Sequence, residues 1–575
     1  YNGEVYNFQK IRESLENSGI NKWKGHSDTE VILASIEKWG IAKTLKLLEG
    51  MFALAVWDQE KRTLCLARDR MGEKPLYYGI NSGALFFGSD LIAFSGSSRW
   101  KPEVDQGALG LFMKYGYISA PFSIYKGIYK LPPGTFLELA AADVTQGGQF
   151  LPEPIPYWSF QEVLKSSHNK PFLGDCKEAV QELEKLLIQS VNLQKIADVP
   201  LGVFLSGGID SSLVTALLQA NSNRPVKSFS IGFGEDIYNE AQHAKAVAVH
   251  LGTDHTELYL TPEDVMAVIP DLPEIYSEPF ADPSQLPTTI VSRLARQHVT
   301  VCLSGDGGDE LFCGYDRYIK DPARWRLINR FPAFARNALS LLIEHIPHGL
   351  LDNMLISAKF LRPNDMKLGS LASSLKKFAQ ELKLSEFKTL YDFRISHWRN
   401  PEEIVQAFSH SYPLLGQEMA MDDFALMMTL DILHYLPDDI LVKVDRSAMS
   451  TSLETRVPLL DHRLVEFAAS LPLSIKIHNG QQKWPLKQIL YNYVPQSLFD
   501  RPKMGFGVPM GVWLRGPLRA WAEELLSEKQ LREKGYLIPG PVRNMWAEHL
   551  AGKHNWQAPL WNVLMFQAWQ EKYKI

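Results

Sequence analysis

The sequence has no long apolar run, few cysteines and no surplus of positive charge. No stretch of about 18 consecutive apolar residues occurs, so no membrane-spanning helix is expected. The formal net charge is -5 at pH 7, which argues against the broad basic surface typical of nucleic-acid-binding proteins. Four cysteines in 575 residues (Cys65, Cys176, Cys302 and Cys313) provide neither a disulfide framework nor the spacing of a zinc site. We therefore expect a cytoplasmic protein with neither nucleic acid nor a membrane as partner.

The length and the strand pattern suggest more than one domain. A hydrophobic content of 45% is ordinary for a globular protein of 575 residues. A helix is expected over residues 28–36, with Ser27 or Asp28 as its cap, among several short strands. This mixture predicts an α+β layered domain over residues 1–150, and a linker is expected at residues 141–175. The strands are expected at residues 50–58, 62–69, 76–79 and 84–89.

A different pattern, in which strands alternate with helices, begins near residue 197. Such alternation predicts an α/β domain with a doubly wound parallel sheet. Residues 315–575 are expected to be mainly helical, and segment 322–420 carries no chemical signature. The expected strands lie near residues 200–205, 226–233, 254–260 and 299–304, and the expected helices near residues 211–220 and 239–251.

Residues 206–212 read Ser-Gly-Gly-Ile-Asp-Ser-Ser and follow the apolar run 201–205. A strand that ends in glycines before a helix aims backbone N–H groups at one small volume, which suits a phosphate group. No Gly-Lys-Ser/Thr closes the loop, so this is not the Walker pattern. A plain strand-to-helix turn would explain the Gly and Ser residues, but not the acid Asp210. The loop resembles the pyrophosphate loop of ATP pyrophosphatases, which cleave ATP between the α- and β-phosphates and adenylate a substrate.

A second Gly-rich loop follows another apolar strand and carries three acids, Asp306, Asp309 and Glu310. Mg²⁺ prefers carboxylate and phosphate oxygens as ligands. An open α/β sheet binds its ligand at the carboxyl ends of its parallel strands, where both loops are expected. We therefore predict that Asp210 and Asp309 share a magnesium ion on the pyrophosphate. The alternative for the second loop is a solvated acidic turn.

Five short motifs occur in order within the first 150 residues. Together they resemble the glutaminase domain of class II glutamine amidotransferases. That resemblance implies an αββα, Ntn-hydrolase-like fold and glutamine as a substrate. The motifs are Asn-Gly-Glu-Val-Tyr-Asn at 2–7, Ser-Asp-Thr-Glu at 27–30, Gly-Met-Phe-Ala at 50–53, Ala-Arg-Asp-Arg at 67–70, and Gly-Glu-Lys-Pro-Leu-Tyr-Tyr at 72–78.

The resemblance implies roles for residues near the start of the chain. Asn2 and Gly3 match the oxyanion hole, where an amide side chain and a backbone N–H stabilise the tetrahedral oxyanion. Glu4 and Asp28 match the carboxylates that bind the ammonium group of glutamine, although a helix cap would also explain Asp28. The family's nucleophile is an N-terminal Cys that precedes the Asn-Gly-Glu motif, so the sequence is expected to be an N-terminally truncated fragment. Cys65 lies within an expected strand and is not a candidate to replace it.

The remaining motifs resemble the synthetase domain of glutamine-hydrolysing asparagine synthetase. The resemblance implies an ATP-pyrophosphatase domain over residues 175–575, with ATP, Mg²⁺, glutamine and aspartate as ligands and a homodimer as the assembly. It also implies that ammonia from glutamine passes through an internal tunnel to an acyl-adenylate. The motifs are the loops at 206–212 and 304–310, Tyr-Leu-Pro-Asp-Asp at 435–439, Lys-Val-Asp-Arg at 443–446, Glu-Thr-Arg-Val-Pro-Leu-Leu-Asp at 454–461, and Arg-Pro-Lys-Met-Gly-Phe at 501–506.

The same resemblance assigns catalytic and ATP-binding residues. Lys503 would stabilise charge that develops on the phosphates. Asp306 is a catalytic candidate at a position where many asparagine synthetases have Glu. Lys443 and Arg446 fit a catalytic role and a structural ion-pair cluster equally well. Ile231 would lie against the adenine, and Ser304 and Gly305 near the ribose. The residues expected to bind ATP are Leu205, Ser206, Gly207, Gly208, Asp210, Ser211, Ser212, Ile231, Ser304 and Gly305.

Three functions are compatible with these motifs. The first is ATP-dependent amidation of aspartate to asparagine. The second is the same chemistry on another carboxylate, such as a cell-surface sugar or peptide, because residues that contact the acceptor have no motif. The third is a non-catalytic nucleotide- or glutamine-binding protein without the N-terminal nucleophile.

Overall fold

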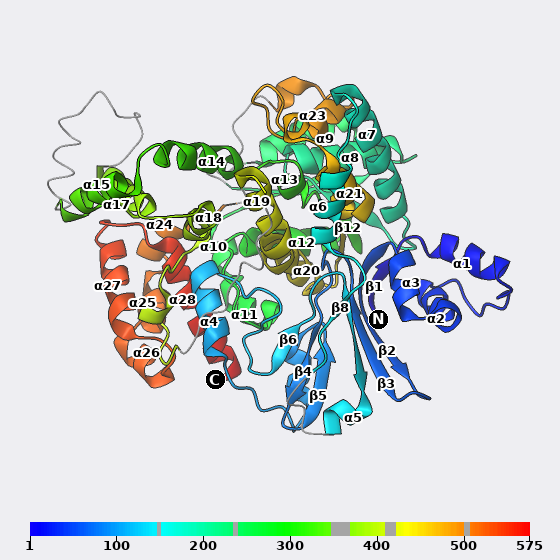
Figure 1. Cartoon of the computed structure of the whole chain (residues 1–575), viewed down its shortest axis with the longest axis horizontal. Helices are drawn as coiled ribbons and strands as arrows, with labels where there is room; N and C mark the ends of the chain where they lie inside the picture. Colours follow the sequence, from blue (N-terminus) through cyan, green and yellow to red (C-terminus); the bar gives the residue numbers. More distant parts are fainter. Residues whose placement is uncertain (146–150, 234–239, 347–367, 409–420, 500–506) are drawn as a thin grey trace. The chain divides into compact units, whose positions relative to one another are not determined.

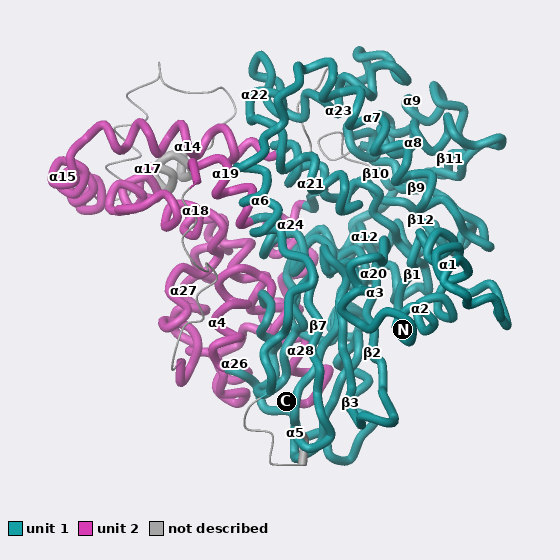
Figure 2. Tube along the Cα trace, turned by 45° about the vertical axis from the view of Figure 1, so that its right-hand side comes forward, with its two compact units in different colours: residues 1–105, 118–314, 431–508 teal, residues 106–117, 315–430, 509–575 magenta. Residues whose placement is uncertain are grey.

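The computed structural model describes residues 1–145, 151–233, 240–346, 368–408, 421–499 and 507–575. These residues form two compact units, which Figure 2 distinguishes by colour. The first unit contains all three sheets, and the second consists of helices. The first unit comprises residues 1–105, 118–314 and 431–508, and the second comprises residues 106–117, 315–430 and 509–575.

The N-terminal part of the first unit contains two antiparallel sheets (Figure 1). One has the strand order β1-β2-β3-β7-β8, and the other has the order β5-β4-β6. The four predicted strands are confirmed as β2 to β5. The strands are β1 (Asn2–Val5), β2 (Gly50–Asp58), β3 (Thr63–Arg68), β4 (Tyr77–Asn81), β5 (Ala84–Gly88), β6 (Ile128–Lys130), β7 (Thr135–Ala140) and β8 (Ile155–Pro156).

Alternate residues of β2 and β3 face opposite sides of their sheet, as the pleat requires. Phe52 and Leu54 share a core with the helices α1, α2 and α3, whereas Ala53 and Leu66 share another core with Tyr78 of β4. The predicted helix after Ser27 is confirmed, since the Ser27 hydroxyl accepts the N–H of Thr29 at 3.0 Å. The helices are α1 (Phe8–Asn17), α2 (Asp28–Trp39) and α3 (Ile41–Leu47).

The expectation of a linker over residues 141–175 is wrong. Helix α5 (Ala141–Thr145), strand β8 and helix α6 (Phe160–Asn169) lie within it, and only residues 146–150 are outside the described residues. Phe160, Val163 and Leu164 fall on one helical face and pack into the core of the following part of the chain. The prolines and polar residues of this stretch concealed that apolar spacing.

The parallel sheet has the order β11-β10-β9-β12-β13, with every neighbouring pair parallel. Its four predicted strands are confirmed, whereas β13 comes from a region that was expected to be helical. The order advances from β9 to β11 and then reverses to β12, which puts the topological switch point between β9 and β12. The strands are β9 (Leu201–Phe204), β10 (Lys227–Phe233), β11 (Asp254–Leu260), β12 (Val301–Leu303) and β13 (Glu454–Arg456).

Two groups of helices accompany this sheet. When successive strands are added toward one edge of a sheet and then toward the other, right-handed crossovers put the connecting helices on opposite faces of the sheet. In agreement, α8 packs against α7, α9 and α23, whereas α12 packs against α20. The apolar core of the first group is formed mainly by α7, α8, α21 and α23. The helices are α7 (Cys176–Gln194), α8 (Ile209–Ala220), α9 (Ala241–Leu251), α10 (Pro262–Met266), α11 (Leu272–Tyr276), α12 (Gln285–Arg296), α13 (Gly308–Leu311), α20 (Leu441–Met449), α21 (His462–Ser470), α22 (Leu473–Lys476) and α23 (Trp484–Leu490), with a π-helical segment at Asp431–Ile440.

The second unit confirms the prediction that the chain after residue 315 is mainly helical. Helix α4 belongs to it, because the Asn562 side chain of α28 donates to the carbonyls of Phe112 (3.2 Å) and Met113 (2.8 Å). None of the described helices is long and apolar enough to cross a membrane. The helices are α4 (Gln106–Tyr115), α14 (Asp316–Ile328), α15 (Ala333–His345), α17 (Leu368–Leu382), α18 (Phe387–Ile395), α19 (Asp423–Leu430), α24 (Met510–Arg515), α25 (Arg519–Leu525), α26 (Glu528–Lys534), α27 (Pro539–Leu550) and α28 (Gln557–Tyr573).

We predict that Arg68→Met destabilises the N-terminal sheets. Arg68 is 2% exposed, and its guanidinium donates to the carbonyls of Lys74 (2.8 Å), Leu131 (2.9 Å) and Gly72 (2.9 Å). Loss of the guanidinium leaves buried carbonyls without a donor, which costs about 3 kcal/mol or more of unfolding free energy. Urea unfolding measures the change. The exposed Lys61→Met is the control, and equal effects of the two substitutions would contradict the prediction.

Candidate active sites

Two Gly-rich loops meet at the switch point of the parallel sheet. Loop 206–212 follows β9 and loop 304–310 follows β12, and these strands are neighbours. A Cβ on Gly305 would lie 2.6 Å from the backbone nitrogen of Ser211, and a Cβ on Gly308 would lie 2.5 Å from the carboxyl carbon of Asp210. Only glycine permits so close an approach. The two loops therefore form one site.

The first loop is held by its own hydroxyl groups. The Ser206 and Ser211 hydroxyls are 2.9 Å apart, and the Ser211 hydroxyl accepts the N–H of Ser206 at 3.2 Å. Gly207 has a φ of +74°, and a Cβ there would lie 2.7 Å from the backbone nitrogen of Ala244 in α9. Helix α8 then begins at Ile209 without a capping side chain in the described residues. Its N-terminal N–H groups, with the dipole of a helix of 12 residues, suit an anion.

Six of the predicted ATP-binding residues are buried, namely Leu205, Gly207, Ser211, Ser212, Ile231 and Ser304. The side chain of Leu205 packs against α9, and Ile231 lies buried within β10, so these two would meet a nucleotide mainly through their backbone. Ser212 is fully buried in α8, and its hydroxyl has no hydrogen-bond partner among the described residues. A buried polar group of this kind requires an explanation, and a bound ligand is one.

One lysine joins the two acids that were predicted to bind metal. The Lys483 ammonium makes ion pairs with Asp210 and, at 2.6 Å, with Asp309. Burial alone would lower the pKa of Lys483, but these two carboxylates outweigh burial and raise it. Since one cation contacts both carboxylates, the pair fits a magnesium ion that completes its shell with phosphate oxygens. No group of three or more His, Cys, Asp or Glu side chains in the described part of the chain could hold a metal by itself.

Asp306 lies beside this pair in a partly buried position. It accepts a hydrogen bond from the Ser304 hydroxyl, and burial raises its pKa although Ser304 and Lys443 act against that rise. Lys443 is ion-paired with Asp282 at 2.8 Å and donates to Ser284 at 2.8 Å. The candidate Lys443 thus belongs to an ion-pair cluster next to Asp306 of the second Gly-rich loop.

The four predicted glutaminase residues lie on and beside β1. Asn2 donates to the Ser89 hydroxyl at 3.0 Å, and Gly3, with a φ of +140°, lies so close to β2 that a Cβ would be 2.0 Å from the Met51 carbonyl. Asp28 accepts the N–H of Val5 at 3.1 Å.

Glu4 lies between two charged groups of opposite sign. Its carboxylate is 3.7 Å from the guanidinium of Arg456, which comes from the parallel sheet. Burial raises the pKa of Glu4 to about 7; Arg456 acts to lower it, and Asp28 adds to the rise. A neighbouring carboxylate that raises the pKa of Glu4 is compatible with a bound cation, such as an ammonium group, at this place.

Cys65 fits the expectation that it is not a nucleophile. It lies within β3 and is buried, and burial raises the pKa of its thiol to about 12. The reactive form of a cysteine is the thiolate, which this raised pKa disfavours.

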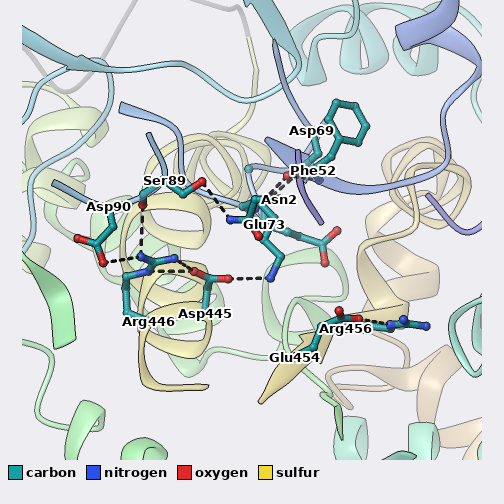
Figure 3. A network of polar contacts seen from close by, with 12 residues as sticks. Asn2, Phe52, Asp69, Glu73, Ser89, Asp90, Asp445, Arg446, Glu454 and Arg456 are labelled. Carbon is teal, nitrogen blue, oxygen red and sulfur yellow. Dashed lines mark hydrogen bonds and ion pairs between the residues drawn. The ribbon is translucent and has the colours of Figure 1, made fainter. Parts of the chain in front are cut away.

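A chain of buried ion pairs joins the N-terminal sheets to the parallel-sheet part of the first unit (Figure 3). Lys74 is ion-paired with Asp445 at 2.9 Å, and their side chains are 3% and 4% exposed. Arg446 makes a second ion pair with Asp445 and contacts Asp90 at 3.3 Å. Arg446 also donates to the Ser89 carbonyl at 3.3 Å, and Ser89 accepts from Asn2. The candidate Arg446 is therefore part of a structural cluster that reaches the oxyanion candidate.

A small pocket, partly open to solvent, lies between these same two parts. Asp69, Arg70 and Glu73 line it from the N-terminal part, and Asp461 and His462 line it from the other. Burial, and next the neighbouring Asp69, raise the pKa of Glu73, which favours its neutral form.

Lys503, the predicted catalytic lysine, lies outside the described residues. The sequence also failed to indicate Lys483, which contacts both metal candidates, and it gave Lys74 only as a member of the motif at 72–78, without showing that its partner is Asp445. Neither lysine belongs to a periodic pattern, and their partners are distant in sequence. The Gly-rich loops were the only available signal that the parts of this site meet.

Comparison with known proteins identifies the family. A family model described as asparagine synthase matches residues 182–571, and one described as a glutamine amidotransferase domain matches residues 1–151. The chain belongs to the asparagine synthase family. The antiparallel sheets thus form a glutamine amidotransferase domain, and the parallel sheet belongs to a synthetase domain with many helices. This confirms the resemblance that the motifs indicated.

Individual relatives extend over nearly the whole chain. Asparagine synthetase [glutamine-hydrolyzing] 1 of Bacillus subtilis is 30% identical over 99% of this chain and 84% of its own length. Asparagine synthetase [glutamine-hydrolyzing] 3 of the same species is 26% identical over 97% of this chain and 86% of its own length. The amidase chyE of Penicillium rubens is 24% identical over 93% of this chain and 80% of its own length.

We predict that Lys74→Met lowers the free energy of unfolding of the protein by about 3 kcal/mol at neutral pH, because it leaves the buried Asp445 with one cationic partner fewer. Burial alone would raise the pKa of Asp445, but Lys74 and then Arg446 lower it. The stability that this carboxylate contributes is therefore present above its unfolded pKa of about 3.9 and is lost as pH falls through the lower folded pKa. The difference between variant and wild type should shrink below about pH 4.

Urea unfolding over a range of pH measures this difference. The control is Lys126→Met, which removes one partner of an exposed ion pair with Glu103 and should cost about 1 kcal/mol or less. A Lys74→Met effect that is equally small, or that grows in acid, would show that the buried pair does not stabilise the fold.

Proposed function

We propose that this protein amidates a carboxylate, with aspartate as the acceptor, by way of an acyl-adenylate and with ammonia from glutamine. The observation that carries this proposal is the meeting of two Gly-rich loops at the switch point, with Asp210 and Asp309 on one cation. That arrangement supplies N–H donors for phosphate and carboxylates for a metal in one place. The family supports ATP cleavage as the chemistry.

The first half-reaction makes the adenylate. A carboxylate oxygen of the acceptor attacks the α-phosphorus of ATP, the bond to the α,β-bridging oxygen breaks, and pyrophosphate leaves. The N–H groups of loop 206–212 and the N-terminus of α8 would hold the pyrophosphate, and the buried Ser212 hydroxyl could then donate to it. Asp210 and Asp309 would hold Mg²⁺, which when bound neutralises charge on the phosphates.

The second half-reaction makes the amide. Ammonia attacks the acyl carbon, the bond from that carbon to the phosphate oxygen breaks, AMP leaves, and one proton passes to solvent. Asp306 lies beside the metal pair and Lys443 lies near Asp306, and both are proposed to contact the adenylate. Lys503 is proposed to stabilise the phosphates as charge develops.

The ammonia would come from residues 1–150, the proposed glutaminase domain, and would be used in the proposed synthetase domain of residues 175–575. Asn2 and Gly3 are proposed to form the oxyanion hole, and Glu4 and Asp28 to bind the ammonium group of glutamine. The small pocket that residues of both parts line lies at the junction that the ammonia would have to cross.

The identity of the acceptor separates two versions of this function. Two relatives are named asparagine synthetases, whereas the relative in Penicillium rubens is named an amidase, which supports a different acceptor. The test supplies ammonium and MgATP with aspartate and identifies the product by mass spectrometry. Asparagine with stoichiometric AMP supports aspartate as acceptor. If AMP forms only with another carboxylate, that carboxylate is the acceptor. If AMP forms with no carboxylate, the protein is non-catalytic.

We predict that Asp210→Ala and Asp309→Ala each abolish acceptor-dependent pyrophosphate release, because each removes a proposed magnesium ligand. Asp210 lies in the first turn of α8 and Asp309 in the short helix α13, and both side chains are partly exposed, so the fold should persist, which circular dichroism checks. The exposed Asp254→Asn, at the start of β11, is the control and should retain activity. Release near the wild-type rate by either variant at saturating Mg²⁺ would refute the metal assignment.

We predict that Lys503→Ala leaves nucleotide binding nearly unchanged and lowers kcat on the order of 10²-fold, as expected for an interaction made mainly in the transition state. Steady-state kinetics and equilibrium binding of ATP measure the two effects separately. The exposed Lys553→Ala is the control. Weaker ATP binding with an unchanged kcat would instead make Lys503 a ground-state phosphate contact.

A further inference from the structure

Lys483 occupies a position built to hold its ammonium between two carboxylates. Its side chain is 8% exposed and contacts Asp210 on the first loop and Asp309 on the second. The residue precedes the first turn of α23 and has a φ of +52°, a conformation that costs free energy in a residue other than glycine. Such strain persists where the surroundings hold the residue in place.

The neighbouring backbone leaves room for this lysine. A Cβ on Gly314 would lie 2.0 Å from Cε of Lys483 and 1.9 Å from Oδ1 of Asp309. The backbone N–H of Lys483 donates to the carbonyl of Phe312 at 3.2 Å. The segment that follows Asp309 thus receives the lysine by both its backbone and its side chain. The contact is part of the fold of the loop and not a chance approach of a long side chain.

We propose that Lys483 competes with the divalent cation for Asp210 and Asp309, and that the cation displaces it only together with the phosphates of ATP. This inference rests on the proposed function, since it takes these two acids as the metal ligands. It adds that the lysine makes metal binding depend on nucleotide.

The physical reason is charge balance in a site of low exposure. A divalent cation that arrives alone must break two charge-assisted hydrogen bonds and leave a buried ammonium group without a counter-charge, which is costly. The phosphates remove that cost, because they supply a new anionic partner for Lys483 and further oxygen ligands for the metal. The free metal should therefore bind weakly, and metal with nucleotide should bind tightly.

The experiment measures Mn²⁺ binding to the full chain by equilibrium dialysis, in which Mn²⁺ held by free nucleotide is the same on both sides of the membrane. Wild type should bind Mn²⁺ alone weakly and bind it tightly with α,β-methylene-ATP, whose α,β-bridge is not cleaved. Lys483→Met should bind Mn²⁺ alone about tenfold or more tightly than wild type, since the competing ion pairs are gone. A misfolded site would not gain affinity, so this gain separates competition from a merely structural role.

Matched variants test whether the gain in Mn²⁺ affinity comes from Lys483 itself and from the two acids that it contacts. Lys487→Met removes the same charge one turn further along α23, where Lys487 is half-buried near Lys483. It should raise the affinity for Mn²⁺ alone much less than Lys483→Met. Adding Asp309→Asn to Lys483→Met should abolish the gain, which would place the metal on the acid pair. Lys483→Gln, which keeps an N–H donor, serves if the methionine variant does not fold and should show the same gain.

The outcomes distinguish this inference from the function on which it rests. If wild type fails to bind Mn²⁺ even with α,β-methylene-ATP, the proposed metal site itself is wrong. If it binds that complex, but Lys483→Met and Lys483→Gln bind Mn²⁺ alone no more tightly than wild type, the competition is refuted. An equal gain in Lys487→Met also refutes it, because the effect is then one of overall charge.

Discussion

The close approach of two loops at the switch point is the constraint on which the synthetase site depends. Gly305 and Gly308 let the backbone of the second loop lie against Ser211 and Asp210 of the first. A side chain at either glycine would force the neighbouring central strands apart or displace the acid. The same approach brings two carboxylates within reach of one cation, an arrangement that is unfavourable without a counter-charge. Lys483 provides that counter-charge from a third segment.

A single short strand connects the two proposed sites within the first unit. The carbonyl of Arg456 in β13 accepts the N–H of Ser304, at the start of the second loop, at 2.9 Å. Its guanidinium reaches Glu4 and donates to the carbonyls of Gln194 (2.8 Å) and Ile196 (2.7 Å). One residue therefore fixes the edge of the second Gly-rich loop by its backbone and pairs by its side chain with Glu4, which is proposed to bind glutamine. A displacement of β13 would therefore move both the second Gly-rich loop and the ion-pair partner of Glu4.

The sequence predicted the elements whose signal is local and failed where the signal is distant. Short apolar runs predicted β2, β9 and β12, the alternation of strands with helices predicted β10 and β11, and the Gly-rich loops after β9 and β12 predicted the candidate site. Strand β13 has three residues and no measurable period, and it exists because β12 offers an unpaired edge. Lys483 was missed for a similar reason, since its acid partners lie on two loops that are far away in the sequence. A lone lysine carries no pattern, and only the folded chain shows which charges meet.

The charges around these sites are matched group by group rather than spread over the surface. Lys74 forms an ion pair with Asp445, Lys443 forms one with Asp282, and Lys483 forms ion pairs with Asp210 and Asp309. Each of these pairs is buried or nearly so, and burying an unpaired charge is far more costly than losing an exposed ion pair. A ligand that adds charge must therefore bring its own compensation or release a cation that is already present. Metal and phosphate together satisfy this condition, because the metal neutralises the carboxylates while the phosphates take over the displaced lysine.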